Sequence, residues 1–150
     1  MKFALITPTT PDAWTQYHTI RKQELFDAKG RINYDPNHPD EHRAGNVPLL
    51  FIADGIGIGT ARLDTRSIDT GVVRLVSITR AEQGKGYGRI LMDRLETLAR
   101  KKEFSKLFLN AAPEAIGFYE RLGYVRDSWD PSELTGISED SVQMSKALFP

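Results

Sequence analysis

The chain has 150 residues, of which 40% are hydrophobic and 27% charged, as is ordinary for a globular domain. Lys plus Arg and Asp plus Glu each number 20, so the formal net charge is zero and the basic excess typical of nucleic-acid binding is absent. The absence of cysteine excludes a disulfide framework, a Cys-based zinc site and a Cys nucleophile.

Membrane and export signals are not found in the sequence. No apolar run approaches the ~20 residues that span a bilayer, and Phe3–Ile6 is too short for a signal peptide's apolar region. We therefore expect one domain over residues 1–150, located in the cytoplasm, with no nucleic-acid or membrane partner.

The first predicted elements are a strand over Phe3–Ile6 and a helix that begins at Thr10-Pro11-Asp12. These three residues are typical of an N-cap, a first helical position and an acidic first turn. Lys29-Gly30 indicates the end of that helix. Residues 31–47 are rich in Asn, Asp, Pro and Gly and predict a long loop, or a loop with a short helix near Asp40–Arg43. Because long loops in compact domains are usually functional, we expect this one to cover an acceptor site and set its specificity.

Three strands follow. Leu49–Ala53, the turn Asp54-Gly55 and a strand from Ile56 to Arg62 predict a hairpin, which also explains the glycines between Gly55 and Thr60 without a phosphate loop. Gly71–Thr79 predicts a third strand, covered on both sides. Its alternation places Val72, Arg74, Val76 and Ile78 on one face and Val73, Leu75 and Ser77 on the other.

The second half begins with glycines at alternate positions in residues 83–88, followed by a helix. Its apolar residues recur at helical spacing: Tyr87, Ile90, Leu91, Leu95 and Leu98. A short strand at Leu107–Leu109, a helix from Pro113 to Gly123 and strands at Tyr124-Val125 and Val142–Leu148 complete the order. This mixed order predicts an α+β sheet with at least one parallel pair beside antiparallel hairpins.

The junction between strand, glycine loop and helix is the strongest functional signal. Three glycines let backbone N–H groups converge, and the next helix adds its positive N-terminal end, so the pattern favours a phosphate or pyrophosphate site over a plain tight turn. Lys85 and Arg89 can add charge. Neither the Lys-Ser/Thr of a Walker A loop nor the Gly-x-Gly-x-x-Gly of a dinucleotide fingerprint is present.

Gln83-x-x-Gly86-x-Gly88, placed after a strand and opening an amphipathic helix, resembles the acyl-CoA signature of the GNAT acetyltransferase superfamily. The segment from Leu109 to Ala112 and the run Ala115–Tyr124, with its Phe118-Tyr119 pair, resemble that superfamily's later strand, helix and strand. The order of elements extends the resemblance over essentially the whole chain. It implies a central mixed, mostly antiparallel sheet of roughly six to seven strands, about four flanking helices and a parallel pair splayed at the cofactor site.

The resemblance also implies roles for particular residues. Backbone groups of Val76, Ser77 and Ile78 would bond the pantetheine arm of acetyl-CoA like an added strand. Tyr119 would reach the sulfur and protonate the leaving thiolate, the alternative for Tyr119 being core packing beside Phe118. The pyrophosphate would be held by the loop and helix start, namely Gln83, Gly84, Lys85, Gly86, Tyr87, Gly88 and Arg89.

Some positions depart from the superfamily pattern. Arg80 stands where many members have proline, Pro113 lies where many have an asparagine, and Ser141 takes the place of a histidine found in some relatives. These departures bear on the acceptor substrate rather than on the cofactor.

A general base is not evident. The Gly71–Thr79 strand has no acid, which leaves Asp64, Glu41 and His42 as candidates, and for each of them a solvated surface position is the favoured interpretation. A metal site at Asp35, His38 and His42 is disfavoured, because Pro39 spoils the helix that this spacing requires; we expect no metal.

The sequence thus favours an enzyme that moves an acetyl group from acetyl-CoA to a primary amine of a small molecule or an exposed protein amine. Without cysteine, direct attack in a ternary complex is expected. Two alternatives stay open: a non-catalytic module that binds or senses acyl-CoA, and a nucleotide-binding domain. Many superfamily members pair as dimers, so a homodimer is compatible with the resemblance.

Overall fold

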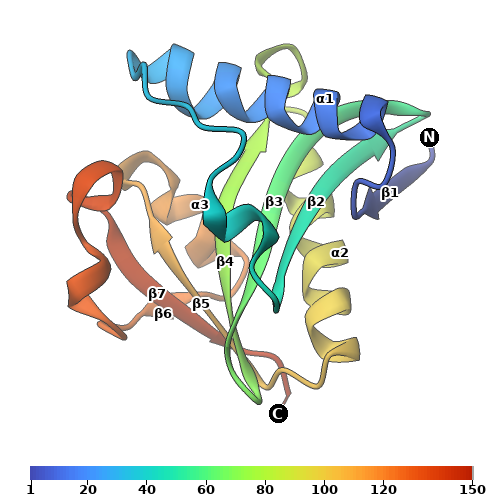
Figure 1. The fold of residues 1–150 in the computed structure, drawn as a ribbon. Coiled ribbons are helices and arrows are strands. Elements are labelled where there is room, and N and C mark those ends of the chain that lie inside the picture. The colour runs from blue at the N-terminus through green and yellow to red at the C-terminus, as the bar shows by residue number, and fades with distance from the viewer. Residues whose placement is uncertain (150) are drawn as a thin grey trace.

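The computed structural model describes residues 1–149, which form one seven-stranded sheet (Figure 1). The spatial order is β1-β2-β3-β4-β5-β7-β6, and every neighbouring pair is antiparallel except β4 and β5. This confirms the expected mixed, mostly antiparallel sheet. The strands are β1 (Phe3–Ile6), β2 (Asn46–Ala53), β3 (Ile56–Ser67), β4 (Thr70–Ile78), β5 (Lys106–Ala111), β6 (Val125–Arg126) and β7 (Val142–Ala147).

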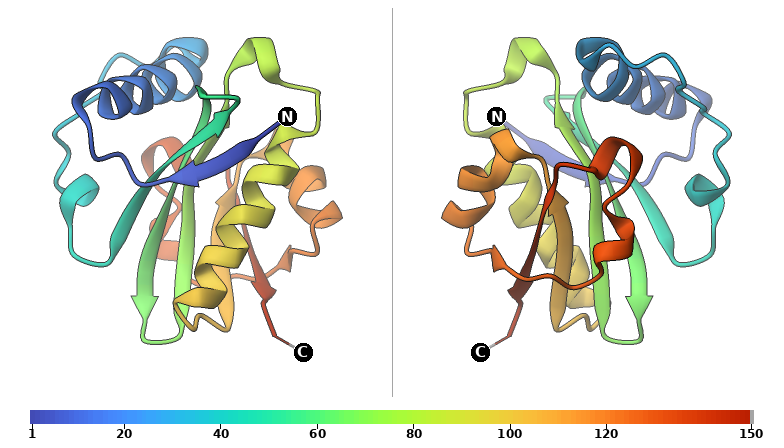
Figure 2. Two further views of the ribbon diagram at one scale, coloured as in Figure 1. Left: turned by 90° about the vertical axis from the view of Figure 1, so that its right-hand side faces the viewer. Right: turned by 90° about the vertical axis from the view of Figure 1, so that its left-hand side faces the viewer.

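Three α-helices cover the sheet: α1 (Pro11–Arg21) on one face, and α2 (Tyr87–Lys101) and α3 (Ile116–Arg121) on the other (Figure 2). The predicted cap of α1 is confirmed, because the Thr10 hydroxyl accepts from the Ala13 N–H at 3.1 Å. After Arg21 the helix widens into a π-helical turn over Lys22–Phe26. Among residues 1–149, no helix is long and apolar enough to cross a membrane.

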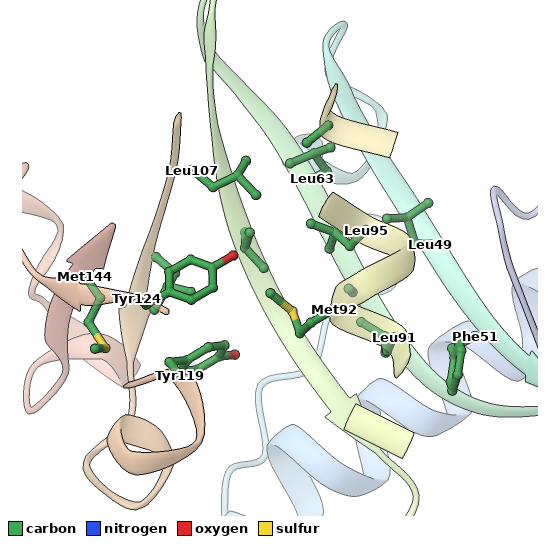
Figure 3. Packing of buried hydrophobic residues seen from close by; sticks show 14 of the residues in the cluster. Leu49, Phe51, Leu63, Leu91, Met92, Leu95, Leu107, Tyr119, Tyr124 and Met144 are labelled. Carbon is green, nitrogen blue, oxygen red and sulfur yellow. The ribbon is translucent and has the colours of Figure 1, made fainter. Parts of the chain in front are cut away.

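The main hydrophobic core lies between the sheet and α2. Leu91 and Leu95 of α2 are fully buried against Leu49, Phe51 and Leu63 from β2 and β3 (Figure 3). A second, smaller cluster forms where Ala13, Tyr17 and Ile20 of α1 cover Leu50 on the other face. Consecutive β2 residues therefore bury toward opposite faces, as the pleat of a strand requires.

The parallel pair separates part-way along its length. β4 and β5 pair only over Thr70–Val73 and Lys106–Leu109, and beyond these residues the two strands diverge (Figure 1). At Leu75, with a φ of 56°, β4 bulges and shifts its register against β3. An extra residue bends and twists a strand, so the bulge directs the end of β4 away from β5. The splayed pair expected from the resemblance is present.

The same bulge corrects the predicted alternation of β4. Val76 and Ile78 pack with Val73 on the α2 face, whereas Arg74 and Ser77 lie on the α1 face. Strict alternation was wrong because the bulge inserts one residue between Arg74 and Val76 without a partner on β3.

Element boundaries differ from the predictions where tertiary contacts extend or shorten the strands. β2 begins at Asn46 and β3 runs on to Ser67, because each continues to pair with its neighbour. Tyr124 lies outside β6, which has only two residues. Pro113 opens a 3-10 turn, and α3 starts at Ile116.

Candidate active site

A cleft of about 1420 Å³ opens where β4 and β5 separate. Arg62 and Arg74, from the α1 face of the sheet, line it, and so do Phe118 and Tyr119 of α3, from the other face. The cleft therefore passes through the gap between the two strands. A molecule in this gap can reach side chains on both faces of the sheet.

The free edge of β4 presents main-chain groups to the cleft. The Thr79 N–H donates to the Ile58 carbonyl at 2.8 Å, which makes these two residues a hydrogen-bonded pair of the β3–β4 ladder. Two residues earlier Ser77 faces Thr60 in the same way, so Ser77 directs its main-chain groups toward β3. The Val76 carbonyl and the N–H and carbonyl of Ile78 then point away from β3, toward the cleft. An extended amide-bearing chain can pair with such an edge.

Gln83 already uses one of these groups. Its side-chain amide donates to the Ile78 carbonyl at 2.8 Å, and the Glu24 carboxylate accepts from the Arg80 N–H at 3.1 Å. Gln83 thus fastens the loop after β4 to the strand it leaves. Its observed contacts position the loop, and the Ile78 N–H and Val76 carbonyl remain as the edge groups that this amide does not engage.

The glycine loop begins α2 without a side-chain cap. Gly84 and Gly86 have φ values of 78° and 83°, and a Cβ added at either would meet no atom within 4 Å. Among the described residues 1–149, no side chain caps the free N–H groups of the first turn of α2, whose N-cap is Gly86. A left-handed loop leading into an uncapped helix start is a suitable cradle for a phosphate or pyrophosphate.

The remaining predicted loop residues have different surroundings. A Cβ on Gly88 would lie 3.2 Å from Cζ of Phe118, so this glycine permits the close approach of α2 and α3. Tyr87 packs against Phe3, with ring centroids 5.5 Å apart. Lys85 pairs with Glu82 at 3.1 Å, and Arg89 is exposed at the cleft.

Tyr119 lies at the divergence of the strands, on α3. Its side chain is 8% exposed and packs between Phe118 and Tyr124, with ring centroids 5.1 and 5.6 Å away (Figure 3). No residue from 1 to 149 hydrogen-bonds its hydroxyl, although Tyr119 lines the cleft, whereas the Tyr124 hydroxyl donates to Glu96 at 3.0 Å. Burial raises the pKa of Tyr119 far above its ordinary value, so the phenol stays protonated over the working pH range.

Two of the three candidate bases are buried, which corrects the expectation of solvated positions. Glu41 is 2% exposed, accepts from the Tyr17 hydroxyl at 2.7 Å and forms an ion pair with Arg21. Asp64 is 8% exposed and accepts from Arg62 at 2.7 and 2.9 Å. Arginines and a tyrosine hydroxyl therefore already occupy the oxygens of both carboxylates. The third candidate, His42, is exposed.

Comparisons of sequence and structure relate this chain to known proteins. A family model described as the acetyltransferase (GNAT) family matches residues 8–124. This chain belongs to the GNAT acetyltransferase family. The matched residues include β4, the glycine loop and α3, all of which border the cleft.

Curated relatives match parts of this GNAT chain. Glucosamine 6-phosphate N-acetyltransferase of Candida albicans is 30% identical over 79 residues, which are 53% of this chain and 53% of that protein. Chloroplastic serotonin N-acetyltransferase 2 of Oryza sativa subsp. japonica is 33% identical over 84 residues, which are 56% of this chain and 40% of that protein. The chain thus spans about half the length of the curated relatives it matches.

Solved structures match the GNAT fold over its full length. An aminoglycoside 6'-N-acetyltransferase complexed with coenzyme A has a TM-score of 0.80 and 12% identity, covering 100% of this chain and 98% of that one. A GNAT acetyltransferase from Staphylococcus aureus Mu50 has a TM-score of 0.79 and 14% identity, covering 99% of this chain and 100% of that one. At these identities the likeness is one of fold.

On the α1 face, this GNAT chain carries an ion-pair network that sequence reasoning missed. Arg74 donates to Asp64 at 2.9 Å and holds Glu133 with two bonds of 2.9 and 3.0 Å. The Asn110 amide also donates to Glu133, at 3.0 Å. These contacts fix the segment 127–141 beside the cleft, which Ile137, Ser138, Asp140 and Ser141 line. The available signal was charge at alternate strand positions, Arg62 and Asp64, on either side of the apolar Leu63.

The long loop also reaches the cleft, as its position in the sequence suggested. Arg31, His38 and Asp40 line it, and the buried Glu41 anchors the loop to α1. No group of three or more His, Cys, Asp or Glu side chains that could hold a metal ion is found within residues 1–149.

Proposed function

We propose that this protein transfers the acetyl group of acetyl-CoA to a primary amine of a small molecule or an exposed protein amine, by direct attack in a ternary complex. The observation that carries the proposal is the cleft itself. It joins a free strand edge, an uncapped glycine loop and a buried phenol without a hydrogen-bond partner.

The cofactor half uses main-chain groups. The Val76 carbonyl and the Ile78 N–H are the edge groups available to the pantetheine amides, while Ser77 holds that edge in place by pairing with Thr60. The Gly84–Gly86 loop and the start of α2 suit the pyrophosphate, and Lys85 and Arg89 supply charge beside it. Gln83 and Tyr87 keep this cradle in position through their own contacts.

The chemical step needs one proton donor, and Tyr119 is proposed to supply it. The amine nitrogen attacks the thioester carbonyl, the carbon–sulfur bond breaks, and the phenol hydrogen of Tyr119 passes to the departing sulfur. The adduct loses its ammonium proton to water, and water returns one proton to the phenolate of Tyr119, so atoms and charge balance: the products are the amide and the CoA thiol. Burial keeps the phenol in the protonated form that can donate, and the same rise in pKa makes it a weaker acid. With no cysteine in the chain, no Cys acyl-enzyme forms.

A second function, binding acyl-CoA without turnover, is favoured by one observation. Glu41 and Asp64, which lie near the cleft, are engaged by arginines and are not available as bases. In that case the protein would sense acyl-CoA, and Tyr119 would only fill space between Phe118 and Tyr124.

The deciding experiment follows CoA thiol release with a panel of small amines and amine-bearing peptides. We expect turnover of at least one acceptor, and a rise in melting temperature with acetyl-CoA that ATP and NAD do not produce. Stabilisation by acetyl-CoA with no turnover across the panel would support the sensing module. Stabilisation by ATP and not by acetyl-CoA would overturn both functions.

A further inference from the structure

Three arginines meet on the α1 face of the sheet, from separate elements. Arg21 ends α1, Arg62 lies on β3, and Arg74 faces Arg62 across the β3–β4 ladder. Arg21 and Arg62 are 6% and 5% exposed. Because guanidinium groups are rarely buried without a specific partner, we expect each of these arginines to have one.

Each arginine has a carboxylate behind it. Arg21 pairs with Glu41, Arg62 with Asp64, and Arg74 with both Asp64 and Glu133. All three arginines line the cleft, and none of these three carboxylates does. The network is neutral in sum, but it presents its positive groups to the cleft and keeps its negative groups away from it.

Two of the guanidinium groups keep donors unused. Nε of Arg21 is buried without a hydrogen-bond partner, the one such side-chain atom within residues 1–149. Arg62 directs Nε and Nη2 at Asp64, while its Nη1 lies 4.0 Å from Glu41, beyond hydrogen-bond distance. A guanidinium has five N–H donors, and a buried donor without a partner is costly. Nη1 of Arg62 is thus available to a ligand in the cleft, whereas Nε of Arg21 is enclosed and could reach one only after its side chain shifts.

We propose that the acceptor carries, besides its amine, an anionic group, a carboxylate or a phosphate, which Arg21 and Arg62 bind. This deepens the proposed function by naming the acceptor class and rests on it. Guanidinium groups held from behind by carboxylates are preorganised to donate to a second anion in front. Each of the three nitrogens of Arg74 already donates, Nε to Asp64 and Nη1 and Nη2 to Glu133, so we assign Arg74 the role of positioning the site.

The acidic residues of the cleft do not compete at this point. Glu24 accepts from the Arg80 N–H, and Asp40 pairs with Arg43 at 3.0 Å. Glu82 and Glu114, which also line the cleft, pair with Lys85 at 3.1 Å and with Lys29 at 3.6 Å. Asp140 is exposed on the segment that follows β6. A cationic acceptor held by these acids is the opposite hypothesis, and the experiment includes it.

The test compares amines that differ only at the far end: γ-aminobutyrate, aminopropylphosphonate, neutral γ-aminobutyramide and the diamine putrescine, each in a series of lengthening spacers. The readout is kcat/KM for each amine at saturating acetyl-CoA. We expect the carboxylate or the phosphonate series to exceed the amide series roughly 10- to 100-fold, the worth of a charge-assisted hydrogen bond. The series with the higher kcat/KM shows whether the site prefers a carboxylate or a phosphate.

Variants connect the preference to the arginines. Arg21→Gln combined with Glu41→Gln removes a pair without leaving a lone charge, and Arg62→Lys keeps the charge but loses the planar fork. Each should reduce the anion preference, measured as the ratio of kcat/KM for the anionic amine to that for the amide, to within about threefold, while acetyl-CoA affinity is retained. The matched control, Lys22→Gln with Asp27→Asn, removes the exposed pair next to Arg21 and should keep the preference.

The remaining outcomes would each overturn the anionic acceptor, acetyl transfer, or both. Equal turnover of anionic and neutral amines, or a preference for putrescine, overturns the anionic acceptor and leaves acetyl transfer intact. If no amine is turned over, calorimetric titration of the same amines onto the protein with CoA distinguishes the two failures. If only the anionic amines bind, the anion site is supported and the proposed acetyl transfer is overturned. If anionic, neutral and cationic amines bind equally, the anion site is overturned as well.

Discussion

The two halves of the cleft are built on different principles. The half proposed to bind the cofactor, here called the cofactor half, consists of main-chain groups within one stretch of chain, from the end of β4 through Gly84 and Gly86 to the first turn of α2. The acceptor half consists of side chains from five separate segments, brought together by the network of Arg21, Arg62 and Arg74. The first requires local backbone geometry, and the second requires the complete fold.

This difference has a functional consequence. Main-chain groups can bind the same cofactor whatever the neighbouring side chains are, so the cofactor half can stay constant while acceptors vary. Side chains on loops and strand faces can change one at a time without disturbing the glycine loop. Substitutions in the two halves should therefore separate cofactor binding from acceptor recognition.

The largest effect is expected where the two halves meet. Tyr119→Phe removes one oxygen and keeps the ring, so packing should hold while turnover falls roughly 10²–10⁴-fold. Acetyl-CoA affinity should be nearly unchanged. Because burial raises the pKa of Tyr119 far above its ordinary value, its loss should lower turnover equally at every working pH. The measurement is kcat across pH, with acetyl-CoA binding by calorimetry.

Tyr124→Phe is the matched control for that change. Tyr124 packs against Tyr119 but bonds Glu96 and does not line the cleft, so its loss should cost about 1 kcal/mol of stability and leave turnover intact. Wild-type turnover in the Tyr119→Phe protein would remove the phenol from the mechanism. Unfolding of that variant would instead favour the packing role.

Gly86→Val should break the cofactor half alone. The left-handed φ of 83° strains a β-branched residue by roughly 1–3 kcal/mol, and its side chain would occupy the open space above the start of α2. We expect acetyl-CoA to lose its effect on the melting temperature. Gly55→Val is the control, because Gly55 has the same φ of 83° and equally open surroundings in a hairpin turn far from the loop along the chain. Equal loss of acetyl-CoA binding in both variants would contradict the proposed role of the Gly84–Gly86 loop in binding the cofactor.

Glu133→Gln should weaken the acceptor half alone. It removes the carboxylate that fixes the segment 127–141 to Arg74 and Asn110, so the acceptor KM should rise several-fold while acetyl-CoA affinity is retained. Glu139→Gln changes an exposed acid of the same segment and should leave both constants unchanged. Steady-state kinetics with each substrate varied in turn would check this. A rise in the acetyl-CoA KM instead would mean that the segment serves the cofactor.

The smallest effect concerns pH and the anchoring of the long loop. Burial first, then Arg21 and His42, lower the pKa of His18 below its ordinary 6.5, and His18 hydrogen-bonds Tyr34. The unfolded chain therefore binds this proton more readily, so stability should decrease as pH falls below about 6.5. Urea unfolding above and below that pH should show a smaller loss in His18→Gln. An identical pH dependence in both proteins would contradict this role.

Much of the fold followed from local signals. The Thr10 cap, the Asp54-Gly55 hairpin and the apolar stripe of α2 each depend on residues close together in the chain, and each is present in the structure. The glycine loop could be predicted for the same reason, because glycine readily adopts the left-handed conformation that Gly84 and Gly86 have. Its role in binding the cofactor stays a prediction.

What only the tertiary structure decided depends on contacts between distant segments. Leu75 adopts a left-handed φ that its residue type does not signal, and this bulge changes the facing of every later residue of β4. Glu41 and Asp64 are buried because Arg21 and Arg74 reach them from other elements and pair with them. The sequence by itself therefore determined the elements and the glycine loop, which local backbone preferences specify. The splay of β4 and β5 and the charged acceptor half came only with the fold, because the energy of a buried charge depends on partners far away in the chain.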